Sequence, residues 1–240
     1  MLITPPGPVT GLVISVASNT TLSILPGNAL DSFGTTLLNL PYFLTLNSGT
    51  TGVNGIDTGS VAPSTFYGIY AIGTTANPAT IGSIMSTSFL FPTMPSGYNI
   101  YRRIGYALTN SASHFVAFVC TPTPSSKIYI YPSPVSVLSA GTGTSYTQID
   151  LTGKVPALIS IPVLFNSSYT ANANGNYFSL IADITATTIP SFISDSANEP
   201  LVSQVSLNAA LIMGAPSIYY LVQTSDSLDL SLVSFEDYLN

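Results

Sequence analysis

The sequence predicts an all-β protein made of two β-sandwich or jelly-roll-like domains in tandem. Short runs of β-branched and aromatic residues recur along all 240 residues, and such runs are typical of strands. Clusters of Pro, Gly, Asn and Ser separate these runs at short intervals. This punctuation is typical of sandwiches and barrels rather than of parallel sheets. The length allows one large all-β domain or two smaller ones, each with a proper core.

The first third of the chain is expected to form short strands after a proline-rich lead. The segment PPGPV at residues 5–9 cannot be helical and predicts an extended lead. Pro41 interrupts an apolar run and places that strand at an edge or a start, because proline cannot donate to a strand ladder. The expected strands are residues 12–16, 21–24, 37–46 and 65–72, followed by residues 81–91, which fit a strand or a short helix.

The stretch Pro95–Tyr106, PSGYNIYRRIGY, carries two of the four basic residues of the chain. Its turn followed by aromatic and β-branched residues predicts a strand. Arg102 and Arg103 are neighbours, so in a strand their side chains point to opposite faces. We expect one of them to face a packed surface or an interface, where its guanidinium binds carboxylates or carbonyls. The alternative is that both are solvated at a strand edge.

The boundary between the two domains is expected near Thr121–Ser126, where two prolines stiffen a segment without apolar periodicity. We therefore predict an N-terminal β-domain at residues 1–121, a linker and connecting strand at 122–135, and a C-terminal β-sandwich domain at 136–240. In the second domain, Asn172–Asn176 predicts a hairpin loop, because Asn-Gly tolerates left-handed geometry. Further strands are expected at residues 177–181, 205–213, 218–223 and 228–233, with a short helix at 201–212 as an alternative.

Charge is scarce in this chain. Charged residues make up 6% of it, against about 25% in an average soluble protein, and the mean hydropathy is +0.46. An uncharged surface is poorly protected against association. We therefore expect copies of the chain or other proteins to cover much of this surface, and we predict a homo-oligomer.

Several partner classes do not fit the composition. The net charge of -6 disfavours nucleic acid, because phosphate binding needs clustered Lys and Arg. The N-terminus lacks the basic region of a secretory signal. No apolar stretch approaches the ~20 residues of a membrane-spanning helix, so we expect no membrane insertion.

Candidate catalytic and metal-binding residues are few. His114 is the single histidine and Cys120 the single cysteine, and both fit structural positions in or beside an apolar strand expected at residues 114–119. The acidic residues are scattered, with Asp195 and Glu199 nearest to a pair, and that loop suits a turn better than a glycosidase site. Asp226 and Asp229 supply too few carboxylates in register for calcium. The sequence therefore predicts no catalytic residue, no cofactor and no metal.

Tyrosine is the more informative residue type. The chain has 14 Tyr and no Trp, and Tyr beside Asn, Ser and Thr is common in contact surfaces. The tyrosines considered for such a surface are Tyr98, Tyr101, Tyr106, Tyr169, Tyr177, Tyr219 and Tyr220. The candidates for receptor binding lie around the expected loop in the second domain: Tyr169, Asn172, Asn174 and Tyr177.

The chain resembles a family of tailed-bacteriophage virion proteins built from β-modules, found as tail fibres, tail tips and head appendages. The first half contains PGPVTGL, LPGNALDSFGTTLLNL, GVNGIDTGSVAPSTFYGIYAIG and FPTMPSGYNIYRRIGYALTNSASHFVAF, and the second contains SYTQIDLTGKVPALISIPVLF and SIYYLVQTSDSLDLSLVSFEDY. A glycine-and-aspartate loop before an aromatic strand, then a strand ending RRIG, is typical of that family. The acidic ending FEDYLN departs from the glycine-containing ending of the family.

The resemblance implies a non-enzymatic structural component of a virion, located on its outer surface at the tail or as a capsid appendage. We expect a homotrimeric fibre or appendage protein that contacts other virion proteins and takes part in attachment to a host cell-surface glycan or protein. The N-terminal part would anchor to the particle, and residues from about Ser136 onward would face outward. A capsid decoration (cement) protein that braces capsid subunits is the first alternative, and a polysaccharide-cleaving spike is the second.

Overall fold

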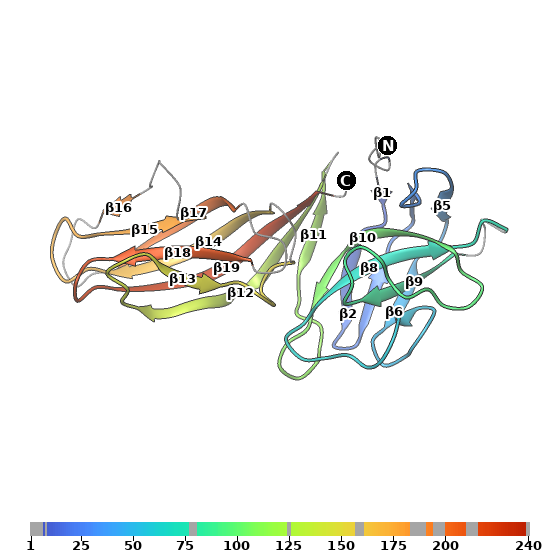
Figure 1. Cartoon of the computed structure of the whole chain (residues 1–240), viewed down its shortest axis with the longest axis horizontal. Helices are drawn as coiled ribbons and strands as arrows, with labels where there is room; N and C mark the ends of the chain where they lie inside the picture. The colour runs from blue at the N-terminus through green and yellow to red at the C-terminus, as the bar shows by residue number, and fades with distance from the viewer. Residues whose placement is uncertain are drawn as a thin grey trace. The chain divides into compact units, whose positions relative to one another are not determined.

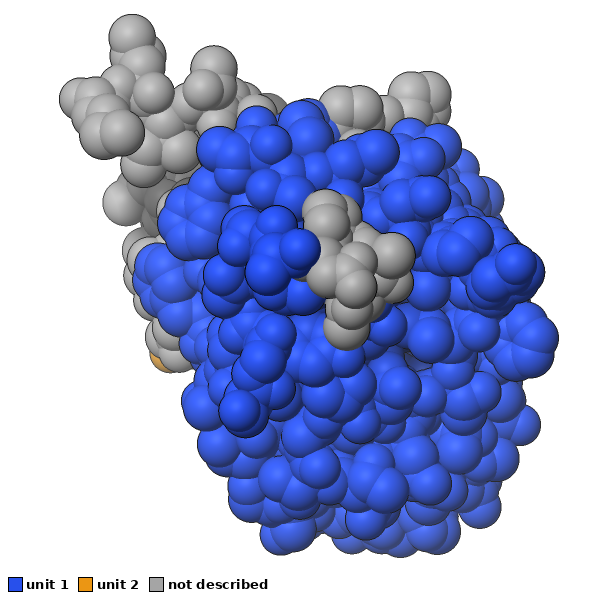
Figure 2. All heavy atoms as spheres, turned by 90° about the vertical axis from the view of Figure 1, so that its right-hand side faces the viewer, with its two compact units in different colours: residues 1–129, 237–240 blue, residues 130–236 orange. Residues whose placement is uncertain are grey.

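The structure is a computed structural model, and it describes residues 7, 9–76, 81–123, 126–156, 161–182, 191–193, 200–209 and 216–238. All regular secondary structure in these residues is β-strand, which confirms the predicted all-β class (Figure 1). The chain forms two compact units: unit 1 is Met1–Tyr129 with Asp237–Asn240, drawn in blue in Figure 2, and unit 2 is Ile130–Glu236. Within the described ranges, no helix is long and apolar enough to cross a membrane.

Unit 1 contains eleven complete strands, and ten of them form three sheets in the orders β1-β4-β5, β2-β3-β6 and β10-β8-β9-β7. Tyr70, Ile84 and Tyr101 belong to a buried cluster on the third sheet, against which Met94 and Tyr98 pack. The strands are β1 (Thr10–Gly11), β2 (Ile14–Ser18), β3 (Thr21–Ile24), β4 (Gly27–Leu30), β5 (Leu37–Leu40), β6 (Leu44–Asn47), β7 (Gly55–Ile56), β8 (Phe66–Gly73), β9 (Ile81–Ser86), β10 (Ile100–Leu108) and β11 (Val119–Pro122).

Unit 2 is a β-sandwich. Its strands belong to a five-stranded sheet, β11-β12-β19-β14-β17, and a four-stranded sheet, β13-β18-β15-β16. The sheets meet through buried side chains such as Tyr169 of β14 and Phe178 of β15, whose ring centroids are 5.1 Å apart. The strands are β12 (Ser126–Gly141), β13 (Thr147–Asp150), β14 (Ile161–Thr170), β15 (Tyr177–Ile181), β16 (Ser191–Ile193), β17 (Pro200–Ala209), β18 (Ser217–Val222) and β19 (Ser227–Tyr238).

The observed division differs from the predicted domain limits. The boundary lies after Tyr129, inside strand β12, and the chain re-enters unit 1 at Asp237, near the end of β19. The predicted linker at 122–135 is therefore mostly strand. Pro132 and Pro134 are tolerated within β12 because β11 has only four residues, so among the described strands most of the sixteen-residue β12 has one neighbour.

Three local expectations are decided by the structure. Residues 81–91 begin with strand β9 rather than a helix, and residues 200–209 form strand β17. The expected strand at 114–119 is wrong for most of its length. In that range Phe115 makes an isolated bridge to Thr109 and Val119 begins β11. At its start, the Asn110 side chain caps a turn by accepting from the backbone amides of Ala112 and His114.

Strand β10 contains a bulge at the RRIG sequence. The register against β8 shifts between Arg103 and Gly105, and the extra residue changes which side chains share a face. Gly105 has φ of +155°, and a Cβ there would overlap the Tyr129 hydroxyl and lie 2.8 Å from Ile14. The next backbone amide, of Tyr106, donates to that hydroxyl at 3.1 Å. Glycine is therefore required for Tyr129 to reach the bulge.

We predict that Gly105→Ala destabilises the protein by about 3 kcal/mol, because the new methyl group must displace a buried tyrosine. Gly97→Ala is the matched control, since Gly97 also has positive φ (+86°) but a Cβ there meets no atom within 4 Å. It should cost about 1 kcal/mol from backbone strain alone. Urea unfolding of both variants measures the difference, and equal losses would show that the contact with Tyr129 is unimportant.

Candidate functional site

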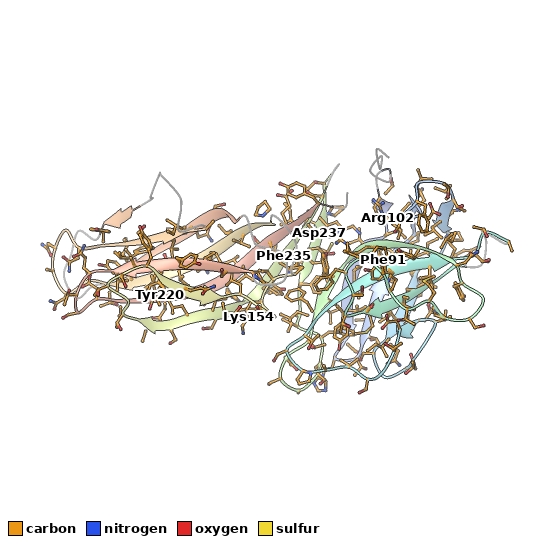
Figure 3. The ribbon with its side chains drawn as sticks, in the orientation of Figure 1. Phe91, Arg102, Lys154, Tyr220, Phe235 and Asp237 are labelled. Atoms are coloured by element: carbon orange, nitrogen blue, oxygen red, sulfur yellow. The ribbon has the colours of Figure 1, made fainter. Side chains whose placement is uncertain are left out.

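A buried ion pair connects strand β10 with the end of β19. Nη1 of Arg103 donates to both carboxylate oxygens of Asp237, at 2.9 and 2.8 Å. The Asp237 side chain is 0% exposed and that of Arg103 is 14% exposed, and Asp237 is labelled in Figure 3. The guanidinium also lies 4.5 Å from the ring centroid of Tyr106. Although burial opposes its charge, the Asp237 carboxylate holds the pKa of Arg103 above its usual value.

Two bulges bring these side chains to the right faces. In β10 the extra residue places Tyr106 on the same side as Arg103, whereas simple alternation would place it on the other. In β19 the buried residues are even-numbered up to Leu232, and the register shifts beside Ser234. After that shift Phe235 and Asp237 are buried, whereas Glu236 is only half-buried.

The second arginine of the pair is also satisfied. Nη2 of Arg102 donates to the Gly7 carbonyl at 3.2 Å, and its side chain is buried. The expectation that an arginine binds a carboxylate or carbonyl is therefore confirmed for both residues, with different partners. Arg102 thus binds Gly7 of the proline-rich segment, and Arg103 binds Asp237 near the end of β19.

A buried lysine lies in the same unit. Nζ of Lys127 donates to the carbonyls of Leu12 and Ile104, at 2.7 and 2.8 Å. Burial lowers the pKa of Lys127 to about 8. The half-buried Cys120 is a near neighbour, and burial raises the pKa of its thiol, so the thiol is protonated at neutral pH and unsuited to nucleophilic chemistry.

The aspartates of the two glycine-rich motifs of unit 1 shape loops. Asp31 is buried and accepts from the backbone amides of Thr35 and Thr36, at 2.7 and 3.2 Å. Asp57, in the GIDTG loop, accepts from Thr93 across the unit at 2.9 Å. These carboxylates thus hold backbone rather than forming a paired acidic site.

The predicted loop of unit 2 is held by the buried carboxylate of Asp226. The sequence did not predict this role for Asp226. Asp226 accepts from the hydroxyl of Tyr169, from the backbone amide of Asn172 at 2.6 Å, and from Nδ2 of Asn176 at 3.1 Å. The loop joins β14 to β15, which belong to different sheets. The hairpin prediction is therefore wrong. The segment is an arch, a loop that joins one sheet of the sandwich to the other, and hydrogen bonds to Asp226 stabilise it.

The four receptor-binding candidates have different positions. Asn172 and Asn174 are exposed on the arch and Tyr177 is half-buried, so all three can contact a partner. Tyr169 is fully buried, so its side chain cannot form part of an outer contact surface. Of the other tyrosines considered, Tyr98 and Tyr219 are half-buried, and those with buried side chains are Tyr101, Tyr106 and Tyr220.

The remaining candidates for chemistry are not brought together. His114 is half-buried in a turn, and Asp195 and Glu199 lie outside the described residues. Asp229 is exposed and accepts from the Ala140 amide at 2.8 Å, while Asp226 is occupied within the arch. The part of the chain that the structure describes has no cluster of three His, Cys, Asp or Glu side chains able to hold a metal ion.

Charge is divided unequally between the units. Unit 1 contains three acidic residues (Asp31, Asp57, Asp237) and three basic residues (Arg102, Arg103, Lys127), so their charges cancel. All six are described, and each is buried or half-buried. Unit 2 contains seven acidic residues and one lysine, and therefore carries the whole net charge of -6. Unit 1 thus has no fully exposed charged side chain among its described residues.

Large apolar side chains are exposed on unit 1 instead. They include Leu25, Phe33, Tyr42, Phe43, Leu90 and Phe91, and Phe91 is labelled in Figure 3. None of them was among the residues predicted to form a contact surface. A signal was present in Pro41-Tyr42-Phe43, because a proline that interrupts a strand leaves the following residues outside regular alternation.

Comparison with known proteins does not assign a family. No family model and no curated protein matches the chain. Among solved structures, the chain is similar to the crystal structure of a Bacillus thuringiensis Cry1Da tryptic core variant, with a TM-score of 0.23 and 11% sequence identity. The match covers 97% of this chain and 52% of that one, so the chain spans about half the length of the toxin core.

We predict that Asp237→Asn lowers the free energy of unfolding by about 3 kcal/mol, because it leaves the Arg103 charge poorly solvated and unpaired. Asp229→Asn is the matched control on the same strand, where the side chain is exposed, and its effect should stay within about 0.5 kcal/mol. Denaturant unfolding measures both. If the two variants lost the same stability, the ion pair would not be holding the fold.

The buried lysine predicts a pH dependence. The pKa of Lys127 falls from 10.5 to about 8 on folding, so the unfolded chain binds more protons between these values and stability rises with pH there. We expect Lys127 to contribute a gain of about 1 kcal/mol between pH 8 and 9. The Cys120 thiol offsets part of this gain, because burial raises its pKa and the unfolded chain releases that proton at lower pH. Above pH 10 the buried tyrosines oppose it, because burial raises the pKa of Tyr129 and Tyr131. The gain should vanish in Lys127→Met and persist in Lys154→Met, and its persistence in Lys127→Met would contradict the assignment.

Proposed function

We propose that the chain is a non-enzymatic structural component of a bacteriophage virion, a homotrimeric fibre or appendage protein that takes part in host attachment. The observation that carries this proposal is the surface of unit 1, where every charged side chain is buried or half-buried although several large apolar ones are exposed. Such a surface associates in water, because neither net charge nor charged side chains oppose contact. It suits a protein that works inside an assembly.

The distribution of charge supports a direction within that assembly. Unit 1 is neutral and fits burial against copies of the chain or other virion proteins, whereas unit 2 carries the charge of -6 and fits contact with solvent. The exposed Asn172 and Asn174 lie on an arch of unit 2 that Asp226 holds firmly. Loops on a rigid scaffold are common binding elements. Unit 1 is therefore the anchoring part and unit 2 the host-facing part.

The roles of the motif residues support a scaffold. In the motifs that resemble phage virion modules, Asp57 holds a loop, Arg102 holds the N-terminal lead and Arg103 binds Asp237. Asp237 itself comes from the acidic ending that departs from the family. The acidic ending of this chain therefore supplies the carboxylate that binds Arg103.

We predict that the purified full chain slows adsorption of its phage to host bacteria, because it occupies the same surface glycan or protein. Antibodies raised against the chain should also label intact particles in electron microscopy. Labelling without any effect on adsorption would favour the capsid decoration protein. Release of sugars from host polysaccharide would favour the cleaving spike, and absence of the chain from particles would contradict a virion role altogether.

A further inference from the structure

Three large apolar side chains project from one corner of unit 1. Leu25 directly follows β3, and Tyr42 and Phe43 directly precede β6. Ile24 pairs with Leu44 in the ladder between these strands, so Leu25 lies opposite Phe43. Leu25 and Phe43 thus form a cross-strand row at the end of the sheet β2-β3-β6, and Tyr42 adjoins the row in a bend outside the ladder. Here the chain passes to and from the sheet β1-β4-β5.

The row faces away from the core. Ile24, one residue before Leu25, is buried, and successive side chains of a strand point to opposite faces. The exposed fractions are 48% for Leu25, 79% for Tyr42 and 66% for Phe43. Two residues further along these strands, the same face carries Ser15, Ser23 and Thr45, which are uncharged. The face therefore combines an apolar end with a hydroxyl-bearing, uncharged continuation.

The charges of unit 1 restrict what can cover this face. A partner that brought a charged side chain would bury it without a counter-charge, because every charged side chain of unit 1 is already buried or half-buried, and burying an unpaired charge is costly. The partner surface must therefore be uncharged and apolar. Unit 1 of another copy has such a surface.

We infer that the corner formed by Leu25, Tyr42 and Phe43 is the surface through which unit 1 binds a second copy of this chain. The inference rests on the proposed homo-oligomeric assembly and assigns a part of the surface to it. Contact between two such corners removes apolar side chains from water and brings no like charges together. Other proteins of the particle are the competing occupants.

Sedimentation velocity over a micromolar concentration range tests the inference. The full chain should sediment as a species heavier than 25.1 kDa, and Leu25→Ser with Phe43→Ser should weaken self-association at least tenfold. The matched control is Leu90→Ser with Phe91→Ser, which also removes one Leu and one Phe from the surface of unit 1, at 60% and 73% exposure. The control should associate like the unchanged chain. Tyr42→Ser is a second variant for which misfolding is not an issue, because the side chain is so exposed, and it should also weaken association.

The outcomes are distinguishable. Oligomers that survive the changes at Leu25, Tyr42 and Phe43 would overturn the assignment of this corner and leave the proposed function intact. Equal weakening by the control pair would show general adhesiveness and would also overturn it. A chain that sediments as a monomer, yet loses binding to particles when the corner is changed, would assign the corner to another virion protein. A monomer without any particle binding would contradict the proposed function itself.

Discussion

The ion pair between Arg103 and Asp237 is the contact on which the architecture of unit 1 depends. It joins residues 134 positions apart, so the unit is complete only when the chain has passed through unit 2 and returned. A buried pair stabilises a fold only with good geometry, because both charges lose their hydration. The bulges in β10 and β19 supply that geometry by turning Tyr106 towards Arg103 and Asp237 into the interior.

The same use of charge explains the surface. Six charged side chains are available to unit 1, and all are engaged inward, on carboxylates, backbone carbonyls or loop amides. No fully exposed charged side chain among the described residues of unit 1 therefore opposes association with neighbouring molecules in water. A fold whose charged side chains bind groups within the fold therefore has a tendency to associate. The charged unit 2 balances it by favouring solvent.

Local patterns predicted much of the fold and little of the site. The strands and turns follow from short runs and turn residues, so β3, β8 and β15 lie within one residue of the predicted ranges, whereas β2 begins two residues later than predicted. Pairings between distant segments escaped prediction, because no local pattern records them. Asp226 is such a case, because it accepts a hydrogen bond from Asn172, 54 residues earlier in the chain. Tyr169 also donates to Asp226 and is buried, so it stabilises the arch and does not contact a partner. The exposed corner at Tyr42 and Phe43 escaped for the opposite reason, since apolar residues are expected inside.

The proposed virion role is tested most directly by an electron cryomicroscopy map of a phage particle that contains the chain, because such a map shows what surrounds each unit. The account predicts that protein density encloses unit 1, formed by copies of the chain and by neighbouring virion proteins, and that unit 2 extends into solvent with the arch at Asn172–Asn176 outermost. A map in which unit 1 stands free in solvent and unit 2 is buried in the particle would contradict it.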